Sequence, residues 1–166
     1  VALTMRHFEI AKILSVGLSR LIRANPELRA MIPELSIVAP ATGGLPVAYG
    51  VGEALRARKV YWAEREEGGE ALRFRQFLDI ESKEKILLVD DIFRTGGKLT
   101  ELKKLVEDRG AEVVGIAVLI YQPLPNAPKF DPLPFYSLAH LDAIYYKDAA
   151  SCDLCKQDVP VVKTWV

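Results

Sequence analysis

The sequence predicts a single α/β domain in which a central, mainly parallel β-sheet is flanked by helices. Three observations support this fold class. Short, nearly all-apolar runs alternate with stretches of helical periodicity, an order typical of buried parallel strands joined by helical crossovers. The chain has 166 residues, which suits one domain with a sizeable core. Half of the residues are hydrophobic and 27% are charged, a normal globular mixture.

The first half of the chain contains two predicted helices and three predicted strands. A helix is expected over residues 4–24, with an apolar face formed by Ile10, Leu14, Leu18 and Leu21, and it ends at Asn25-Pro26. A buried strand, LSIVAP, is followed by the glycine turn ATGGLP and an apolar helix to about Arg56. KVYWAE is a second strand, EREEGGE a polar turn, and ALRFRQF, residues 71–77, a half-exposed strand because apolar and basic residues alternate.

The second half repeats the alternation of strand and helix. KILLVDD, residues 85–91, is predicted to be a third buried strand, and a helix is expected over 97–109, ended by Gly110. AEVVGIAVLIY, residues 111–121, is a fourth strand, and a proline-rich connection leads to FYSLAH. We expect one domain over residues 1–166, with a C-terminal tail at 148–166 that contains a Cys-x-x-Cys pair.

Charge and hydropathy exclude several classes of partner. Lysine plus arginine equals aspartate plus glutamate, 22 each, so the chain has no electrostatic footprint for nucleic acid or an anionic membrane. No apolar run approaches the ~18 residues that a membrane-spanning helix needs. We therefore expect a cytoplasmic protein that holds any phosphate ligand with loops and single cations.

The stretch LLVDDIFRTGGK, residues 87–98, carries the densest polar chemistry. Ligands of open α/β sheets bind beyond the carboxyl ends of the strands, and this stretch lies at such an end. A helix N-terminus with glycines and cations suits a phosphate, whereas two adjacent acids suit vicinal hydroxyls or a hydrated divalent cation. The combination describes a ribose phosphate. The candidate residues are Asp90, Asp91, Arg94, Thr95, Gly96, Gly97 and Lys98.

Two simpler interpretations of this stretch are a nucleotide-binding Walker loop and an ordinary turn. It is not a Walker loop, which needs glycine where Ile92 stands and Ser or Thr where Leu99 stands. A strand-to-helix turn with solvated acids is the alternative, and paired acids at the end of a buried strand argue against it.

ILLVDDIFRTGGK resembles the signature with which type I phosphoribosyltransferases bind phosphoribosyl pyrophosphate (PRPP). The resemblance implies the type I phosphoribosyltransferase fold, with Asp90 and Asp91 on the ribose hydroxyls and residues 94–98 around the 5-phosphate. It also implies Mg²⁺, which prefers phosphate oxygens and water to an all-protein cage. Asp90 and Asp91 would then meet the metal indirectly, through PRPP hydroxyls or water.

VAPATGGLPVAYGVGEAL is similar to the pyrophosphate-binding loop of the orotate branch of this family. This similarity implies that Ala41, Thr42, Gly43 and Gly44 present backbone amides to pyrophosphate. YWAEREEGGEALRFRQF resembles the flexible segment of some bacterial orotate phosphoribosyltransferases, which implies that Arg65 reaches pyrophosphate when the segment closes, with support from Arg73 and Arg75.

The tail CDLCKQDVPVVK resembles a tail of the same bacterial group. Its two cysteines, Cys152 and Cys155, have three interpretations: packed thiols, a redox-sensitive pair, or half of a metal site shared between chains.

The resemblance breaks at three places. It begins near VALTMRHFEIAKIL, so we expect the N-terminal hood that helps enclose orotate to be absent or truncated. The family usually has threonine where Arg94 stands, and serine or threonine where Lys98 stands. In the family, the corresponding strand normally ends in an Asp-Arg pair whose arginine binds orotate. Here the matching pair is Tyr121-Gln122. Gln122 can form hydrogen bonds but cannot neutralise a carboxylate, and Arg94 is a candidate for the lost charge.

By resemblance, the predicted function is transfer of ribose 5-phosphate from PRPP to a nucleobase, with orotate favoured, in a homodimer. The alternative is a PRPP-binding regulatory protein without turnover. A phosphoacceptor domain is a third class, but it would need a lysine at a later strand end, where Gln122 stands.

Overall fold

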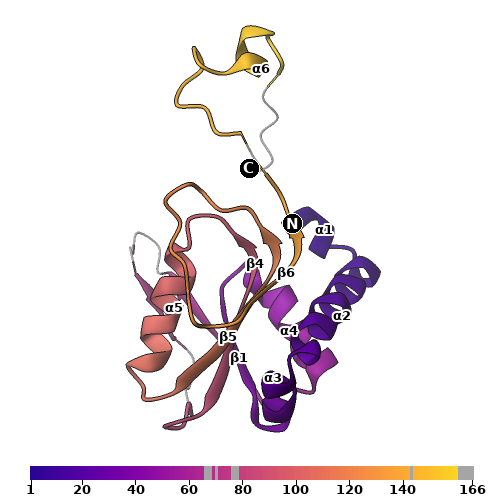
Figure 1. The fold of residues 1–166 in the computed structure, drawn as a ribbon, viewed down its shortest axis with the longest axis vertical. Coiled ribbons are helices and arrows are strands. Elements are labelled where there is room, and N and C mark those ends of the chain that lie inside the picture. The colour runs from indigo at the N-terminus through magenta and orange to yellow at the C-terminus, as the bar shows by residue number, and fades with distance from the viewer. Residues whose placement is uncertain (66–68, 70, 76–78, 143, 161–166) are drawn as a thin grey trace.

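The computed structural model describes residues 1–65, 69, 71–75, 79–142 and 144–160. It confirms the predicted fold class: one α/β domain around a six-stranded sheet with the strand order β3-β2-β1-β4-β5-β6 (Figure 1). All neighbouring strands run parallel except β2 and β3. The strands are β1 (Ser36–Pro40), β2 (Val60–Arg65), β3 (Leu72–Arg73), β4 (Lys85–Phe93), β5 (Glu112–Tyr121) and β6 (Phe135–His140).

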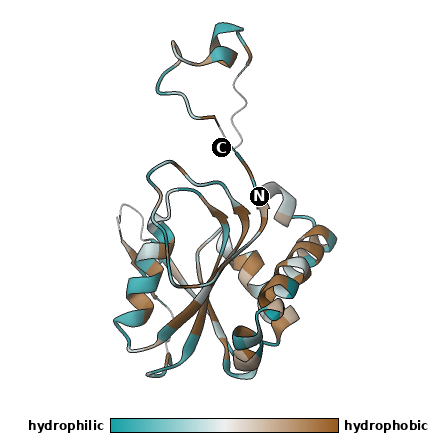
Figure 2. Cartoon of the chain, viewed as in Figure 1, coloured by the Kyte–Doolittle hydropathy of each residue, from teal (hydrophilic) through white to brown (hydrophobic). Residues whose placement is uncertain are grey.

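The helices cover both faces of this sheet. They are α1 (Ala2–Met5), α2 (Phe8–Ala24), α3 (Pro26–Met31), α4 (Gly44–Leu55), α5 (Gly97–Glu107) and α6 (Asp153–Lys156), with a 3-10 turn at Ile32–Glu34. Helices α2, α3 and α4 pack on one face and α5 on the other (Figure 1). Helices α2, α3, α4 and α5 turn apolar residues towards the sheet, whereas α6 lies in the tail and buries none (Figure 2). No helix of the described residues is both long and apolar enough to cross a membrane.

The N-terminal helix differs from the prediction in extent and in rotation. The helix is interrupted between Met5 and Phe8, so two helices, α1 and α2, stand in place of the single predicted one. Leu18 and Ile22 are fully buried, as predicted for Leu18, but Ile10 and Leu21 are 43% and 39% exposed. The reason is the crossing with α4, where a Cβ on Gly50 would lie 2.2 Å from Ser15 Oγ. This close approach selects the small residues of α2 for the interface.

The predicted strand over 71–77 is wrong in length. Only Leu72 and Arg73 pair with β2, antiparallel at the sheet edge, and residues 76–78 lie outside the described part. The long strand β4 runs two residues past the predicted end, through Phe93. Gly110, at φ +78°, follows α5 as expected for a residue that ends a helix.

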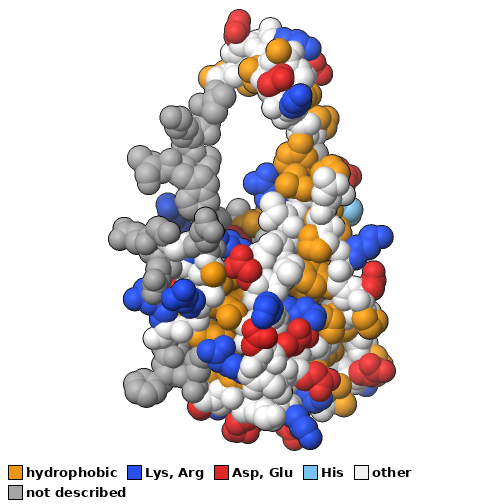
Figure 3. Space-filling view, turned by 90° about the vertical axis from the view of Figure 1, so that its left-hand side faces the viewer, with side chains coloured by type: hydrophobic (Ala, Val, Ile, Leu, Met, Phe, Trp, Pro, Cys, Tyr) orange, Lys and Arg blue, Asp and Glu red, His pale blue; other side chains and the backbone are white. Residues whose placement is uncertain are grey.

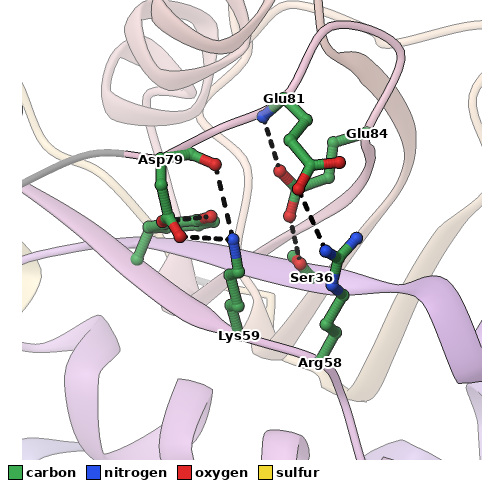
Figure 4. A network of polar contacts seen from close by, with 7 residues as sticks. Ser36, Arg58, Lys59, Asp79, Glu81 and Glu84 are labelled. Atoms are coloured by element: carbon green, nitrogen blue, oxygen red, sulfur yellow. Dashed lines mark hydrogen bonds and ion pairs between the residues drawn. The ribbon is translucent and has the colours of Figure 1, made fainter.

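Polar side chains join the amino ends of β1, β2 and β4 at the edge of the sheet where these strands begin (Figure 4). The buried Glu84 accepts hydrogen bonds from Ser36 Oγ at 2.5 Å and from the Glu81 backbone N–H at 2.8 Å. Beside them, Asp79 accepts hydrogen bonds from Lys59 Nζ at 2.6 Å and Tyr61 OH at 3.0 Å. These contacts lie away from the carboxyl ends of the strands.

The strand order reverses direction at the centre of the sheet. From β1 the chain passes to β2 on one side and then returns to β4 on the other. Such a switch point opens a crevice between the loops that follow the two central strands. The segments after β1 and at the end of β4 are the two glycine-containing loops that the sequence singled out.

Candidate active site

Two adjacent carboxylates lie where β4 reaches the carboxyl edge of the sheet. Asp90 is only 3% exposed, and its Oδ1 accepts the Asp91 backbone N–H at 2.8 Å. Asp91 is half-buried. Both line a cavity of about 310 Å³ that continues along the loop to the first turn of α5. Asp90 therefore forms part of the floor of a cavity and is not lost in the apolar core.

The glycine loop after β1 packs directly against this pair. A Cβ on Gly44 would lie 3.1 Å from Asp90 Oδ1 and 2.9 Å from Pro40 Cδ, and a Cβ on Gly43 would lie 3.1 Å from Asp91 Oδ2. The loop is tied to β2 by the Ala41 N–H, which donates to Ala63 O at 2.7 Å. Residues 41–44 and 90–91 thus meet across the switch point, and glycine allows the close approach.

The loop between β4 and α5 forms the rest of the cavity wall. Arg94, Thr95, Gly96 and Lys98 line it, and all except Gly96 are exposed. Gly96 has φ +74°, and a Cβ there would lie 2.6 Å from Pro128 Cγ, so the position requires glycine. The Thr95 hydroxyl oxygen accepts the Gly97 N–H at 3.3 Å. A helix N-terminus flanked by two cations is a favourable place for a phosphate.

The electrostatics of the acid pair are unusual. Burial, and then repulsion from Asp91, raise the pKa of Asp90 from 3.8 to about 8, although the Asp91 N–H and the Lys98 ammonium act in the opposite direction. A free site at neutral pH therefore holds a proton on this pair. A ligand that donates hydrogen bonds to the carboxylate, or brings a cation to it, stabilises the ionised form.

The residues present fit a magnesium ion that is held mainly by its substrate. Two carboxylates offer the hard oxygen donors that Mg²⁺ prefers. Among the described residues, no group of three or more His, Cys, Asp or Glu side chains is arranged to hold a metal by itself. This donor set suits an ion that keeps water and phosphate oxygens in most of its coordination positions.

Several predicted site residues lie outside the wall of the cavity: Gly97, residues 41–44, Arg65 and Gln122. Arg65, at the end of β2, forms an ion pair with Glu101 of α5, with an N–O distance of 2.9 Å. Gln122 follows β5, and its backbone N–H donates to Phe93 O at 2.9 Å. Neither side chain belongs to the lining of the 310 Å³ cavity.

Sequence reasoning missed how the segments after β5 and β6 approach the same loop. The proline-rich connection brings Pro128 against Gly96, and the Arg94 guanidinium lies 5.6 Å from the centre of the Tyr145 ring. Phe93, Tyr121, Phe130 and Phe135 form an aromatic cluster that lines a neighbouring cavity of about 420 Å³. The aromatic residues of 121–135 were the available signal, but no spacing rule placed them on this loop.

Charges elsewhere on the surface are mixed. On the face that carries α5, acidic and basic side chains lie close together and neither sign gathers in a large patch of the described surface (Figure 3). This agrees with the balanced composition and leaves the loop cations as a local feature.

Comparison with known proteins connects this geometry to a family. Residues 28–132 match the family model described as a phosphoribosyl transferase domain. The chain is 35% identical over 156 residues to the orotate phosphoribosyltransferase of Carboxydothermus hydrogenoformans, covering 93% of this chain and 75% of that protein. The chain belongs to the phosphoribosyltransferase family.

Further members show the range of the likeness. The orotate phosphoribosyltransferase of Thermotoga maritima is 36% identical over 129 residues, which are 77% of this chain and 65% of that relative. The chain thus spans about two thirds to three quarters of these two relatives. A phosphoribosyltransferase structure from Corynebacterium diphtheriae matches with a TM-score of 0.60 and 25% identity, covering 82% of this chain and 78% of that one. The orotate phosphoribosyltransferase of Mycobacterium tuberculosis, solved with inorganic phosphate, has the same fold, with a TM-score of 0.54 and 21% identity over 82% of this chain and 74% of that one.

Proposed function

We propose that this member of the phosphoribosyltransferase family transfers ribose 5-phosphate from PRPP to orotate and releases pyrophosphate. One observation carries the proposal: the paired carboxylates of β4 line a cavity of about 310 Å³ and pack against the glycine loop after β1, at the switch point of the sheet. The two relatives named orotate phosphoribosyltransferase, at 35% and 36% identity, support orotate as the base.

Each part of the cavity suits one part of PRPP. Asp90 and Asp91 accept hydrogen bonds from the ribose hydroxyls, and residues 94–98 enclose the 5-phosphate. Gly43 and Gly44 lie beside the carboxylates, so the loop at residues 41–44 binds the pyrophosphate on the neighbouring carbon, although the Ala41 N–H is already donated to Ala63 O. Mg²⁺ bound with PRPP would supply charge stabilisation for the departing pyrophosphate.

Proton chemistry at the acid pair follows from its burial. The carboxylate of Asp90 is costly to ionise in the free site, and two ribose hydroxyls that donate to the pair offset this cost. The pair then holds the sugar in place while its reacting carbon moves between pyrophosphate and base. Fixed positioning of this kind lowers the barrier without a strong nucleophile.

Two arginines bind the anionic groups of the leaving group and of the base. Arg65 leaves Glu101 and contacts pyrophosphate during the reaction; most of the segment that follows it, residues 66–68 and 70, lies outside the described residues. Arg94 supplies the positive charge for the orotate carboxylate, and Gln122 adds a hydrogen bond. By analogy with the family, two copies form a homodimer.

Binding and turnover are tested separately. Isothermal titration with PRPP and Mg²⁺ should show heat for the wild type and none for Asp90→Asn/Asp91→Asn. A wild-type protein that shows no heat contradicts the proposal. Pyrophosphate release should then be measured with orotate, uracil and the purine bases. Release only with orotate supports the proposal, release only with another base overturns orotate as the substrate, and PRPP binding without any release identifies a regulatory protein instead.

A further inference from the structure

The two cysteines lie outside the body that carries the candidate active site. Cys152 immediately precedes the short helix α6 and Cys155 lies within it, in the tail that follows β6 (Figure 1). Cys152 is half-buried and Cys155 is exposed. The interpretation as packed thiols is therefore wrong for Cys155, because buried structural cysteines are enclosed by apolar neighbours.

The turn brings the two thiols into an unequal relationship. The Cys155 N–H donates a hydrogen bond to Cys152 Sγ at 3.3 Å, so the backbone stabilises negative charge on the first sulfur. A hydrogen bond between the two thiols, followed by this backbone contact, lowers the pKa of Cys152, against the opposing charge of Asp153. The same thiol contact raises the pKa of Cys155. Cys152 is thus the cysteine that ionises more readily, and Cys155 is the one that stays protonated as a thiol.

The described residues offer no partners that would turn this pair into a metal site. No group of three or more His, Cys, Asp or Glu side chains could hold an ion in the described part of the chain. The nearby acids have other contacts: Asp148 accepts the Ser151 N–H at 2.8 Å, and Asp153 pairs with Lys156 at 3.3 Å. A structural zinc ion needs four ligands, and a single copy supplies two.

We propose that Cys152 and Cys155 form a reversible dithiol–disulfide pair that reacts with low-molecular-weight disulfides. The geometry carries this inference: a Cys-x-x-Cys turn with two accessible sulfurs, a backbone donor on the first, and no further metal ligand in the described residues. In a dithiol of this spacing, the attacking cysteine is the one whose thiolate is better stabilised, which here is Cys152 with its backbone donor.

The reaction balances without another reagent. The Cys152 thiolate attacks one sulfur of a small disulfide, which forms a mixed disulfide and releases one small thiolate. Cys155 then attacks Cys152 Sγ, which closes the internal disulfide and releases the second small thiolate. The two protons lost by the cysteine thiols pass to the released thiolates. The protein is oxidised by two electrons and the small disulfide is reduced by two.

The test is to equilibrate the full chain in glutathione redox buffers, quench it with acid, and measure its mass and free thiols. Each wild-type chain should lose two thiols and the mass of two hydrogens without becoming linked to another chain, and dithiothreitol should reverse this oxidation. Cys155→Ser should accumulate one glutathione on Cys152. Cys152→Ser should gain glutathione several-fold more slowly near neutral pH, because its remaining thiol lacks the backbone donor.

Other outcomes overturn the proposal. Two glutathiones on the wild type, or a disulfide between chains, would show that the thiols do not react as an internal pair. Equal rates for the two single variants would remove the assigned roles. Zinc that is bound in stoichiometric amount and protects both thiols from oxidation would make the pair part of a metal site. Far-ultraviolet circular dichroism of each variant checks that the fold is unchanged.

Discussion

Asp90 is the residue on which binding and stability make opposite demands. It is almost fully buried beside a second acid, which favours its protonated form, yet its proposed role is to accept hydrogen bonds as a carboxylate. A buried acid of this kind is a common mark of a functional site, because folding alone would place an apolar residue there. The conflict leads to two predictions that use the same variant.

The first prediction concerns binding. PRPP donates ribose hydroxyls to the ionised form, so its affinity should rise as the pH increases towards the folded pKa of about 8 and then level off. Below that pH, binding should release a proton. Isothermal titration in buffers with different enthalpies of ionisation measures this release. Phosphates of PRPP also titrate, and the Asp90→Asn variant, if it retains weak binding, isolates their share. Proton uptake by the wild type would contradict the assignment.

The second prediction concerns the free protein. The pKa of Asp90 is 3.8 when unfolded and about 8 when folded, so the unfolded chain binds fewer protons between these values. The stability that its protonated form provides is full below the lower pKa and is lost as the pH rises through the upper one. Asp90→Asn removes this loss and should be more stable than the wild type at pH 8, by roughly 2 kcal/mol. Urea unfolding at pH 5 and pH 8 measures the difference, and an advantage that is equal at both pH values would refute the explanation.

Between strands and helices, the ion pair of Arg65 and Glu101 connects the end of β2 to α5. Glu101 also accepts the Leu72 N–H at 3.1 Å, so one carboxylate contacts both β2 and β3. Both charged side chains are about 40% exposed, at 42% and 37%, so the pair stabilises the fold only slightly. A weak contact of this kind suits an arginine that must leave it during catalysis.

The third prediction separates the two residues of that pair. Arg65→Ala should lower kcat about 100-fold, the usual loss when a group that stabilises developing charge is removed, with little change in KM for PRPP. Glu101→Gln keeps the side-chain shape and leaves Arg65 in place, so its kcat should be close to the wild-type value or higher. Steady-state kinetics with PRPP and orotate measures both. An equal loss in the two variants would show that the ion pair is structural.

The sequence was sufficient to predict most helices and strands, but not which face of a helix is buried or which distant segments come into contact. The strands β1, β2, β4, β5 and β6 were predictable because each contains a short apolar run and is bounded by turns. The rotation of α2 was not, because the chain has more apolar residues there than one face can bury, and Gly50 of α4 decides which face is used. The loops at 41–44 and 90–98 were predictable since their chemistry is local. The contacts of Pro128 and Tyr145 with the second loop depend on tertiary packing alone.

On the scale of the whole molecule, the side of the sheet where the strands begin (the amino edge) and the side where they end (the carboxyl edge) have different roles. The carboxyl edge holds glycines, exposed cations and a protonated acid, none of which favours stability. The amino edge holds a connected polar network in which the buried Glu84 joins the start of β1 to the turn before β4 (Figure 4). The second edge is therefore expected to stabilise the fold and to leave the chemistry unaffected.

The fourth prediction tests this division with a matched pair of variants. Glu84→Ala leaves the buried Ser36 hydroxyl and the Glu81 N–H without their acceptor, and should cost about 2 kcal/mol of unfolding free energy. Glu81→Ala removes only an ion pair with Arg58, in which the Arg58 and Glu81 side chains are 45% and 59% exposed. This change should cost about 0.5 kcal/mol of unfolding free energy or less. Urea unfolding gives both values. PRPP affinity, measured where each variant is folded, should match the wild type, because the network lies at the edge of the sheet opposite to Asp90 and Asp91. If Glu84→Ala weakens PRPP binding while Glu81→Ala does not, the two edges are energetically coupled through β1 and β4, and the division of roles between them is wrong.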